Sequence, residues 1–166
     1  IYSASRPVST FSFRDHVFRG AKFHEMLLQL GEERFGVSTA ERSGQDLRVT
    51  SLERTLVDVL DRPDLTGSWE EIWRSLESIE FFDLDKVVEY VRLLNNATTA
   101  AKVGYFLEQH HETLMVDDLH LSMLRGMRPR QPHYLDRSKR KSGRLVSGWN
   151  LVVPEDVFER SWGEVL

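Results

Sequence analysis

The sequence predicts an α+β protein, and three observations indicate this class. Short segments with alternating apolar residues come first, amphipathic helical segments occupy the middle, and alternation returns near the C-terminus. With 40% hydrophobic and 29% charged residues among 166, we expect an ordinary folded chain with a real core. We therefore expect one domain over residues 1–166, with short antiparallel strands, four to five central helices, and a C-terminal β-hairpin followed by a short helix.

The N-terminal part, residues 1–48, is predicted to be a strand-rich lead-in. Phe11 and Phe13 alternate with polar residues, which is typical of a half-buried strand. The segment "EMLLQL", residues 25–30, fits a strand or a helix, and periodicity leaves this open. Residues 43–44, Ser-Gly, predict a turn before another alternating segment.

Residues 49–127 are predicted to form the helical core. In "VTSLERTLVDVLDRP", Thr50 and Glu53 have the spacing of a capping box, and Pro63 predicts the end of the first helix. One turn apart, Arg54 and Asp58 can form an ion pair. The predicted apolar stripe consists of Leu52, Leu56, Val59 and Leu60.

The second and third helices have matching apolar stripes. The second begins with a capping box at Ser68 and Glu71. Its stripe and that of the third helix share the same offsets, which predicts an antiparallel pair on a common core. The two stripes are Trp69, Ile72, Trp73, Leu76 and Ile79, and Leu84, Val87, Val88, Val91 and Leu94.

Two more helices and a β-hairpin are expected further along the chain. The fourth helix spans residues 98–112, where Gly104 would permit close packing, and the fifth ends near Gly126. In the C-terminal part, residues 128–166, the alternating segment 144–154 predicts a strand that pairs with residues 133–138. A short helix from Pro154 ends the prediction.

The net charge of −4 conceals a strong local asymmetry. Residues 125–144, hereafter the basic segment, hold eight of the 22 Lys and Arg and only one acid, Asp136. Such a segment is usually a solvated loop, but it also suits a polyanion or an acidic partner. The residues that we expect to make such a contact are Arg128, Arg130, Arg137, Lys139, Arg140, Lys141 and Arg144.

Several functional classes lack their signatures. The chain has no cysteine, which removes thiolate chemistry and fits a reducing cytoplasm, and no apolar run approaches the length of a membrane span. Motifs of serine hydrolases, zinc proteases and phosphate-binding loops are missing from the sequence. We expect no metal, no cofactor and no membrane contact. The N-terminus begins without methionine, so we expect the natural protein to extend further upstream.

An enzymatic alternative remains on the sequence. Gly67 and Ser68, followed by Asp83 and Asp85, have the order in which minimal nucleotidyltransferases hold a triphosphate and then magnesium. An amphipathic helix with two tryptophans separates the two pairs, and Ser68 and Asp83 also suit helix caps. A structural role is therefore the preferred interpretation.

The opening block carries a resemblance to a known family. "VTSLERTLVDVLDRP", then "GSWEE", "GYFLE" and "GRLVSGWNLVVP", resembles the AbiEi family of antitoxins and transcriptional regulators over most of residues 45–155. In that family a "vT-x-x-ERTLvD-x-l-x-rP" segment follows an N-terminal winged helix-turn-helix. No such winged helix precedes residue 1 here.

The resemblance implies a non-enzymatic bacterial antitoxin of a type IV toxin–antitoxin pair, which acts in the cytoplasm against phage infection. Its implied partners are a nucleotidyltransferase toxin, AbiEii-like, and operator DNA that is bound mainly through the winged helix. A plain protein-interaction domain is a further alternative.

Overall fold

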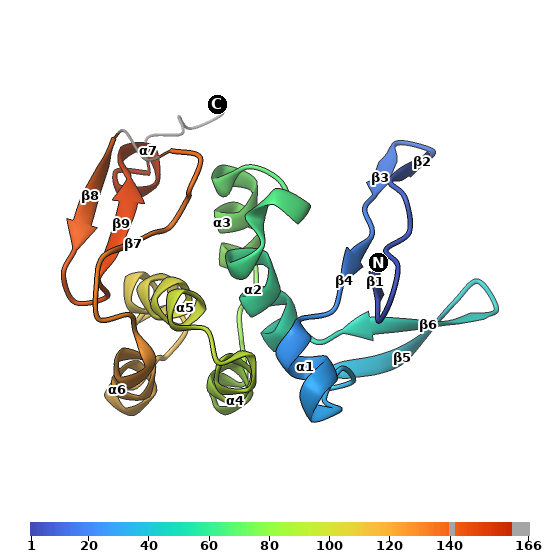
Figure 1. The fold of residues 1–166 in the computed structure, drawn as a ribbon, viewed down its shortest axis with the longest axis horizontal. Coiled ribbons are helices and arrows are strands. Elements are labelled where there is room, and N and C mark those ends of the chain that lie inside the picture. Colours follow the sequence, from blue (N-terminus) through green and yellow to red (C-terminus); the bar gives the residue numbers. More distant parts are fainter. Residues whose placement is uncertain (140–141, 161–166) are drawn as a thin grey trace. The chain divides into compact units, whose positions relative to one another are not determined.

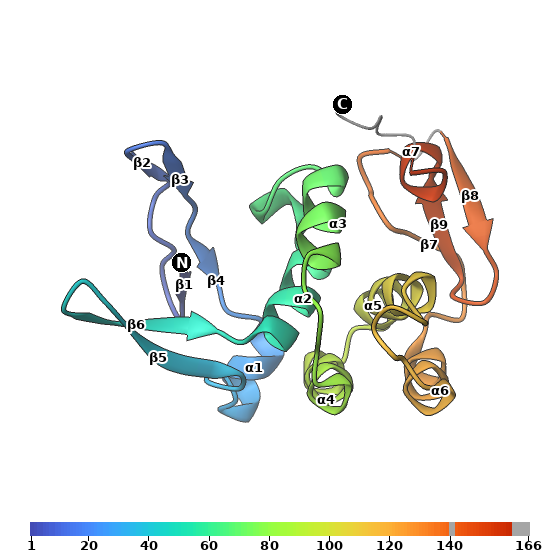
Figure 2. The same ribbon diagram turned by 180° about the vertical axis from the view of Figure 1, so that it is seen from behind.

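The structure, a computed structural model, describes residues 1–139 and 142–160 and confirms the α+β class (Figures 1 and 2). The chain divides into two compact units, residues 1–50 and the residues from Ser51 onward. We call them the N-terminal unit and the helical unit. Residues 140–141 and 161–166 lie outside the described part.

Short strands dominate the N-terminal unit. β1 pairs in parallel with β4, whereas β2 with β3 and β5 with β6 are antiparallel. The expected turn at Ser43 and Gly44 is confirmed, and both residues have positive φ, as a tight two-residue hairpin requires. The elements are β1 (Tyr2–Ser3), β2 (Phe11–Phe13), β3 (His16–Phe18), β4 (Ala21–Lys22), α1 (Glu25–Leu30), β5 (Val37–Arg42) and β6 (Gln45–Thr50).

The ambiguous segment 25–30 is helical. Gly31 ends α1 in the left-handed conformation, with φ of 71°. The backbone N–H groups of Gly31 and Glu32 donate to the carbonyls of Leu28 and Leu27, which closes the last turn. The glycine after the apolar run was therefore the local signal for a helix.

The helical unit contains five helices of nine or more residues, as predicted, and a small sheet. Its elements are α2 (Leu52–Asp61), the short 3₁₀ helix η1 (Pro63–Leu65), α3 (Trp69–Glu77), α4 (Leu84–Leu94), α5 (Ala97–Gln109), α6 (Asp118–Met127), β7 (His133–Tyr134), β8 (Gly143–Val146), β9 (Leu151–Pro154) and α7 (Glu155–Phe158).

α5 is the centre of the helical unit. All residues from 99 to 107 are buried, and the helix contacts α2, α4, α6 and β9. A helix that is buried on all sides needs small residues where its neighbours approach. Gly104 meets this need, because the Trp149 ring lies directly over it and leaves no room for a Cβ atom. The close packing predicted for Gly104 is confirmed.

The start of α2 differs from the prediction. Ser51 is the N-cap, and its hydroxyl accepts from the N–H of Arg54, whereas Thr50 ends β6. Glu53 accepts instead from the N–H of Asp83 at 3.1 Å, so it supports the start of α4. The capping box predicted at Thr50 is therefore wrong, whereas the one at Ser68 and Glu71 is confirmed.

The predicted antiparallel pair of α3 and α4 is also wrong. α4 packs on α2 and α6, while α3 contacts α2. Figure 1 looks nearly along α4 and α6, whereas α3 lies across the view. Matching apolar stripes indicate that each helix buries one face, but they do not say which neighbour covers that face.

The C-terminal sheet has the order β7-β9-β8. Residues 144–154, predicted as one strand, form a hairpin of their own, β8 and β9, around a turn at residues 147–150. β7 pairs with β9 in parallel, through His133 and Tyr134. α7 begins directly after Pro154, as expected.

Candidate functional site

A cavity of about 660 Å³ opens in the helical unit. Its lining comes from the end of α2, the start of α3, the first turns of α5, and the chain that follows β7. Charged side chains contributed by these elements include Asp61, Lys102, Asp136 and Arg137. We call it the Lys102 cavity, because Lys102 is its most deeply buried cation.

Lys102 lies in the second turn of α5, with only 7% of the residue exposed. Its Nζ donates to the main-chain oxygen of Asp61 at 3.5 Å and lies 5.8 Å from the centre of the Trp69 ring. Burial lowers the pKa of Lys102 below its ordinary value, and the carboxylates of Asp61 and Asp136 oppose part of this shift. The cavity thus holds a positive charge in a partly dehydrated position.

Asp136 organises the loop on the other side of the cavity. It accepts hydrogen bonds from Trp69 Nε1 at 2.9 Å and from the N–H of Ser138 at 2.8 Å. Partial burial acts to raise the pKa of Asp136, but the hydrogen bonds from Ser138 and Trp69 outweigh it and keep this pKa below its usual value. Asp136 therefore stays ionised and ties the basic segment to α3.

Two hydrogen bonds at the start of α5 complete the frame. Thr98 Oγ1 and His133 Nδ1 are 2.5 Å apart, which joins α5 to β7. The hydroxyl of Thr99 donates to the carboxylate of Asp61 and so joins α5 to α2. The cavity wall is therefore held by side-chain contacts between four separate elements.

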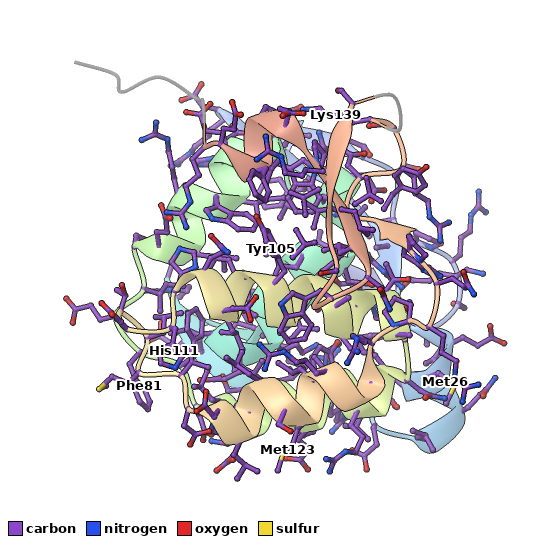
Figure 3. All side chains as sticks on the ribbon, turned by 90° about the vertical axis from the view of Figure 1, so that its left-hand side faces the viewer. Met26, Phe81, Tyr105, His111, Met123 and Lys139 are labelled. Atoms are coloured by element: carbon purple, nitrogen blue, oxygen red, sulfur yellow. The ribbon has the colours of Figure 1, made fainter. Side chains whose placement is uncertain are left out.

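Acidic residues of α7 pair with two of the predicted contact residues. Lys139 lies at the end of the helical unit that carries α7 and pairs with Asp156 (Figure 3). Arg144 lies 3.0 Å from Glu155, and its guanidinium lies 4.4 Å from the centre of the Phe158 ring. These pairs reduce the positive charge that the two residues present to an external partner.

The remaining predicted contact residues are spread along the segment. Arg128 and Arg130 are exposed on either side of buried Pro129, after α6. Arg137 is exposed and lines the Lys102 cavity together with Lys139. Arg140 and Lys141 lie outside the described residues. The basic segment therefore does not form one continuous patch over the part that the structure describes.

The residues of the enzymatic alternative are separated. Gly67 and Ser68 line the cavity, but Asp83 and Asp85 are not part of its described lining. Asp83 caps α4 and lies 2.9 Å from Lys86 Nζ, while the almost fully exposed Asp85 lies 3.0 Å from His120 Nε2. The geometry favours helix capping and surface pairing for both carboxylates.

The histidines also have structural surroundings. His110 stacks on Phe106 and lies 2.9 Å from a carboxylate oxygen of Glu77. Within residues 1–139 and 142–160, no three His, Asp or Glu side chains come together in a way that could hold a metal ion.

Sequence reasoning missed Lys102, Asp61 and Asp136 as members of one site. A signal was present at Lys102, since it interrupts the buried face of a helix rich in small and apolar residues. Asp61 and Asp136 are 75 positions apart, and no local pattern in the sequence relates them.

Comparison of the chain with models of protein families, with curated proteins and with solved structures finds no match. No helix among the described residues combines the length and apolar character that crossing a bilayer requires. The function is therefore inferred from the residues of this chain.

Proposed function

We propose that the chain is an AbiEi-like antitoxin and regulatory domain that counteracts a nucleotidyltransferase-type toxin without catalysing a reaction itself. The observation that carries this proposal is the resemblance of residues 49–63 to the segment that recurs in that family. The structure supports it by giving that segment a structural meaning.

Each polar residue of the segment with a described partner serves the fold. Ser51 caps α2, and Glu53 accepts from the backbone of Asp83. Arg54 and Asp58 form a buried pair within α2. A shared string whose residues build a helix and anchor its neighbours is what a shared fold would retain, and it supplies no set of catalytic groups.

Any contact of this chain with operator DNA is proposed for Arg128 and Arg130. Both are exposed and neither is paired with a carboxylate within the described residues. Contacts to phosphates would strengthen binding without reading the sequence, and they would weaken steeply as salt rises. Replacing both arginines by glutamine should reduce this salt dependence if the contact exists.

A growth-rescue experiment tests the proposal. The neighbouring nucleotidyltransferase-like reading frame is expressed in a bacterial host with and without residues 1–166, and growth is followed. We expect the chain to restore growth. A Gly104→Leu variant is the misfolded control, because a larger side chain collides with the Trp149 ring.

Two outcomes would overturn the proposal. The first is persistent growth arrest while the wild-type chain is shown to be folded and the toxin active. The second is magnesium-dependent nucleotidyl transfer by the purified chain that is lost in Asp83→Asn. The second result would favour the enzymatic alternative that uses Asp83 and Asp85.

A further inference from the structure

The Lys102 cavity has no role in the function proposed above, and the inference drawn from it is independent of that function. Its volume of about 660 Å³ lies in the range of sites that bind small organic molecules. It lies wholly within the helical unit, whose helices and loop frame it through the contacts of Asp61, Thr98 and Asp136.

Lys102 supplies the first indication of the ligand. An ammonium group has three donors, and buried cations are normally paired with an anion or with several acceptors. Within the part of the chain that the structure describes, Lys102 makes one hydrogen bond, to a main-chain oxygen at 3.5 Å. An anionic oxygen that enters the cavity would meet the remaining donors.

Further cations line the same cavity. Arg137 and Lys139 approach from the basic segment, whereas Lys102 approaches from α5. A guanidinium fork and ammonium groups together are the side chains that bind phosphate oxygens in proteins. Since Lys139 is already paired with Asp156, we assign the anchoring of the anion to Lys102 and Arg137.

The rest of the lining would not suit a bare anion. Asp64 and Asp136 contribute carboxylates, which accept hydrogen bonds from hydroxyl and amino groups. Ser68 and Asn96 can donate as well as accept, and Tyr134 adds a partly exposed aromatic ring for a planar group. The fitting ligand therefore combines a phosphate with hydroxyl or amino donors and a flat ring.

We propose that the Lys102 cavity binds a nucleoside monophosphate group, with its phosphate at Lys102 and Arg137. The group is either a free nucleotide or the terminal nucleotide of a single strand, since both carry the same chemistry. No bond is made or broken, and the binding requires no magnesium, because the cations of the chain meet the phosphate.

Isothermal titration calorimetry with residues 1–166 tests this proposal. The four ribonucleoside 5′-monophosphates, adenosine and inorganic phosphate are titrated in the presence of EDTA. We expect at least one monophosphate to bind at one site, with adenosine and phosphate at least about tenfold weaker. A 5′-phosphorylated trinucleotide that binds more tightly than the best mononucleotide would identify a strand end as the source.

Three variants locate the site. Arg137→Gln changes an exposed side chain of the lining, and Arg130→Gln is its matched control in the same segment, outside the lining. We expect about a tenfold loss of affinity in Arg137→Gln, a similar loss in Lys102→Met, and no change in Arg130→Gln. Circular dichroism establishes that each variant is folded before its affinity is compared.

The proposal is overturned if none of the four monophosphates binds saturably, or if adenosine binds as tightly as its monophosphate. It is equally overturned if Arg130→Gln weakens binding as much as Arg137→Gln, because that would mean diffuse charge attraction. Growth rescue does not depend on any of these results, so the two proposals can fail separately.

Discussion

The guanidinium Nε of Arg54 lies 3.5 Å from a carboxylate oxygen of Asp58, one turn further along α2, and both side chains are buried. The hydroxyl of Tyr90 on α4 donates to Asp58 at 2.7 Å, and Arg54 also lies over the Tyr90 ring. The ion pair expected from the i,i+4 spacing is therefore part of a network that joins two helices.

Removing the charge of Asp58 should destabilise the fold strongly. Asp58→Asn leaves the Arg54 guanidinium buried without its carboxylate, so we expect a loss of about 3 kcal/mol in the free energy of unfolding. Urea denaturation measures the change. The matched control is Arg74→Gln, which breaks the exposed pair with Glu70 and should cost about 0.5 kcal/mol at most. Equal losses in the two variants would contradict a buried network.

Two glycines on helices should respond in opposite directions to alanine. In Gly104→Ala the new Cβ atom would meet the Trp149 ring at 2.1 Å, so we expect a loss of about 3 kcal/mol or more. Nothing lies within 4 Å of the equivalent position on Gly126, near the end of α6. There alanine should stabilise by about 0.5 kcal/mol, because it restricts the unfolded chain and favours the helix. Thermal denaturation of both variants compares the two signs.

A third prediction concerns the start of α2. Ser51→Ala removes the hydroxyl that accepts from the N–H of Arg54, and we expect it to cost about 1 kcal/mol. Thr50→Ala should cost less, since Thr50 ends β6 and does not cap the helix. Urea denaturation of the two variants decides between these residues. A larger loss in Thr50→Ala would restore the capping box that the spacing of Thr50 and Glu53 suggested.

Local patterns predicted local structure well and spatial neighbours poorly. The cap at Ser68, the stop at Pro63 and the turn at Ser43 were all readable, because short-range chemistry determines them. Glu53 was misassigned because its partner, the N–H of Asp83, is 30 positions away.

The candidate site was hidden for the same reason. The cavity brings Asp61, Lys102 and Asp136 together from three elements, and only the packing of α5 against α2 and the C-terminal sheet relates them. Charge content drew attention to the basic segment, but the partners of Lys139 and Arg144 on α7 became evident only in three dimensions.

Lys102 connects stability with the site, and the last prediction follows from its pKa. Burial lowers this pKa in the folded chain below the ordinary value of 10.5, so at neutral pH the folded state bears the cost of a buried ammonium. In Lys102→Met that cost is removed while the volume is retained. We expect the variant at neutral pH to be as stable as the wild type or more stable, by about 1 kcal/mol.

The pH dependence gives the sharper test. Between the lowered pKa of folded Lys102 and 10.5, the unfolded chain binds more protons at this residue than the folded chain, so its contribution to stability rises with pH. Below that window the contribution is constant and unfavourable. Urea denaturation of wild type and Lys102→Met at several values from about pH 7 to about pH 10 isolates it, because titrations elsewhere cancel in the difference. We expect the wild type to gain on the variant as the pH rises. A difference that does not change with pH would mean that Lys102 titrates alike in both states, and that its ammonium is not held in a dehydrated cavity.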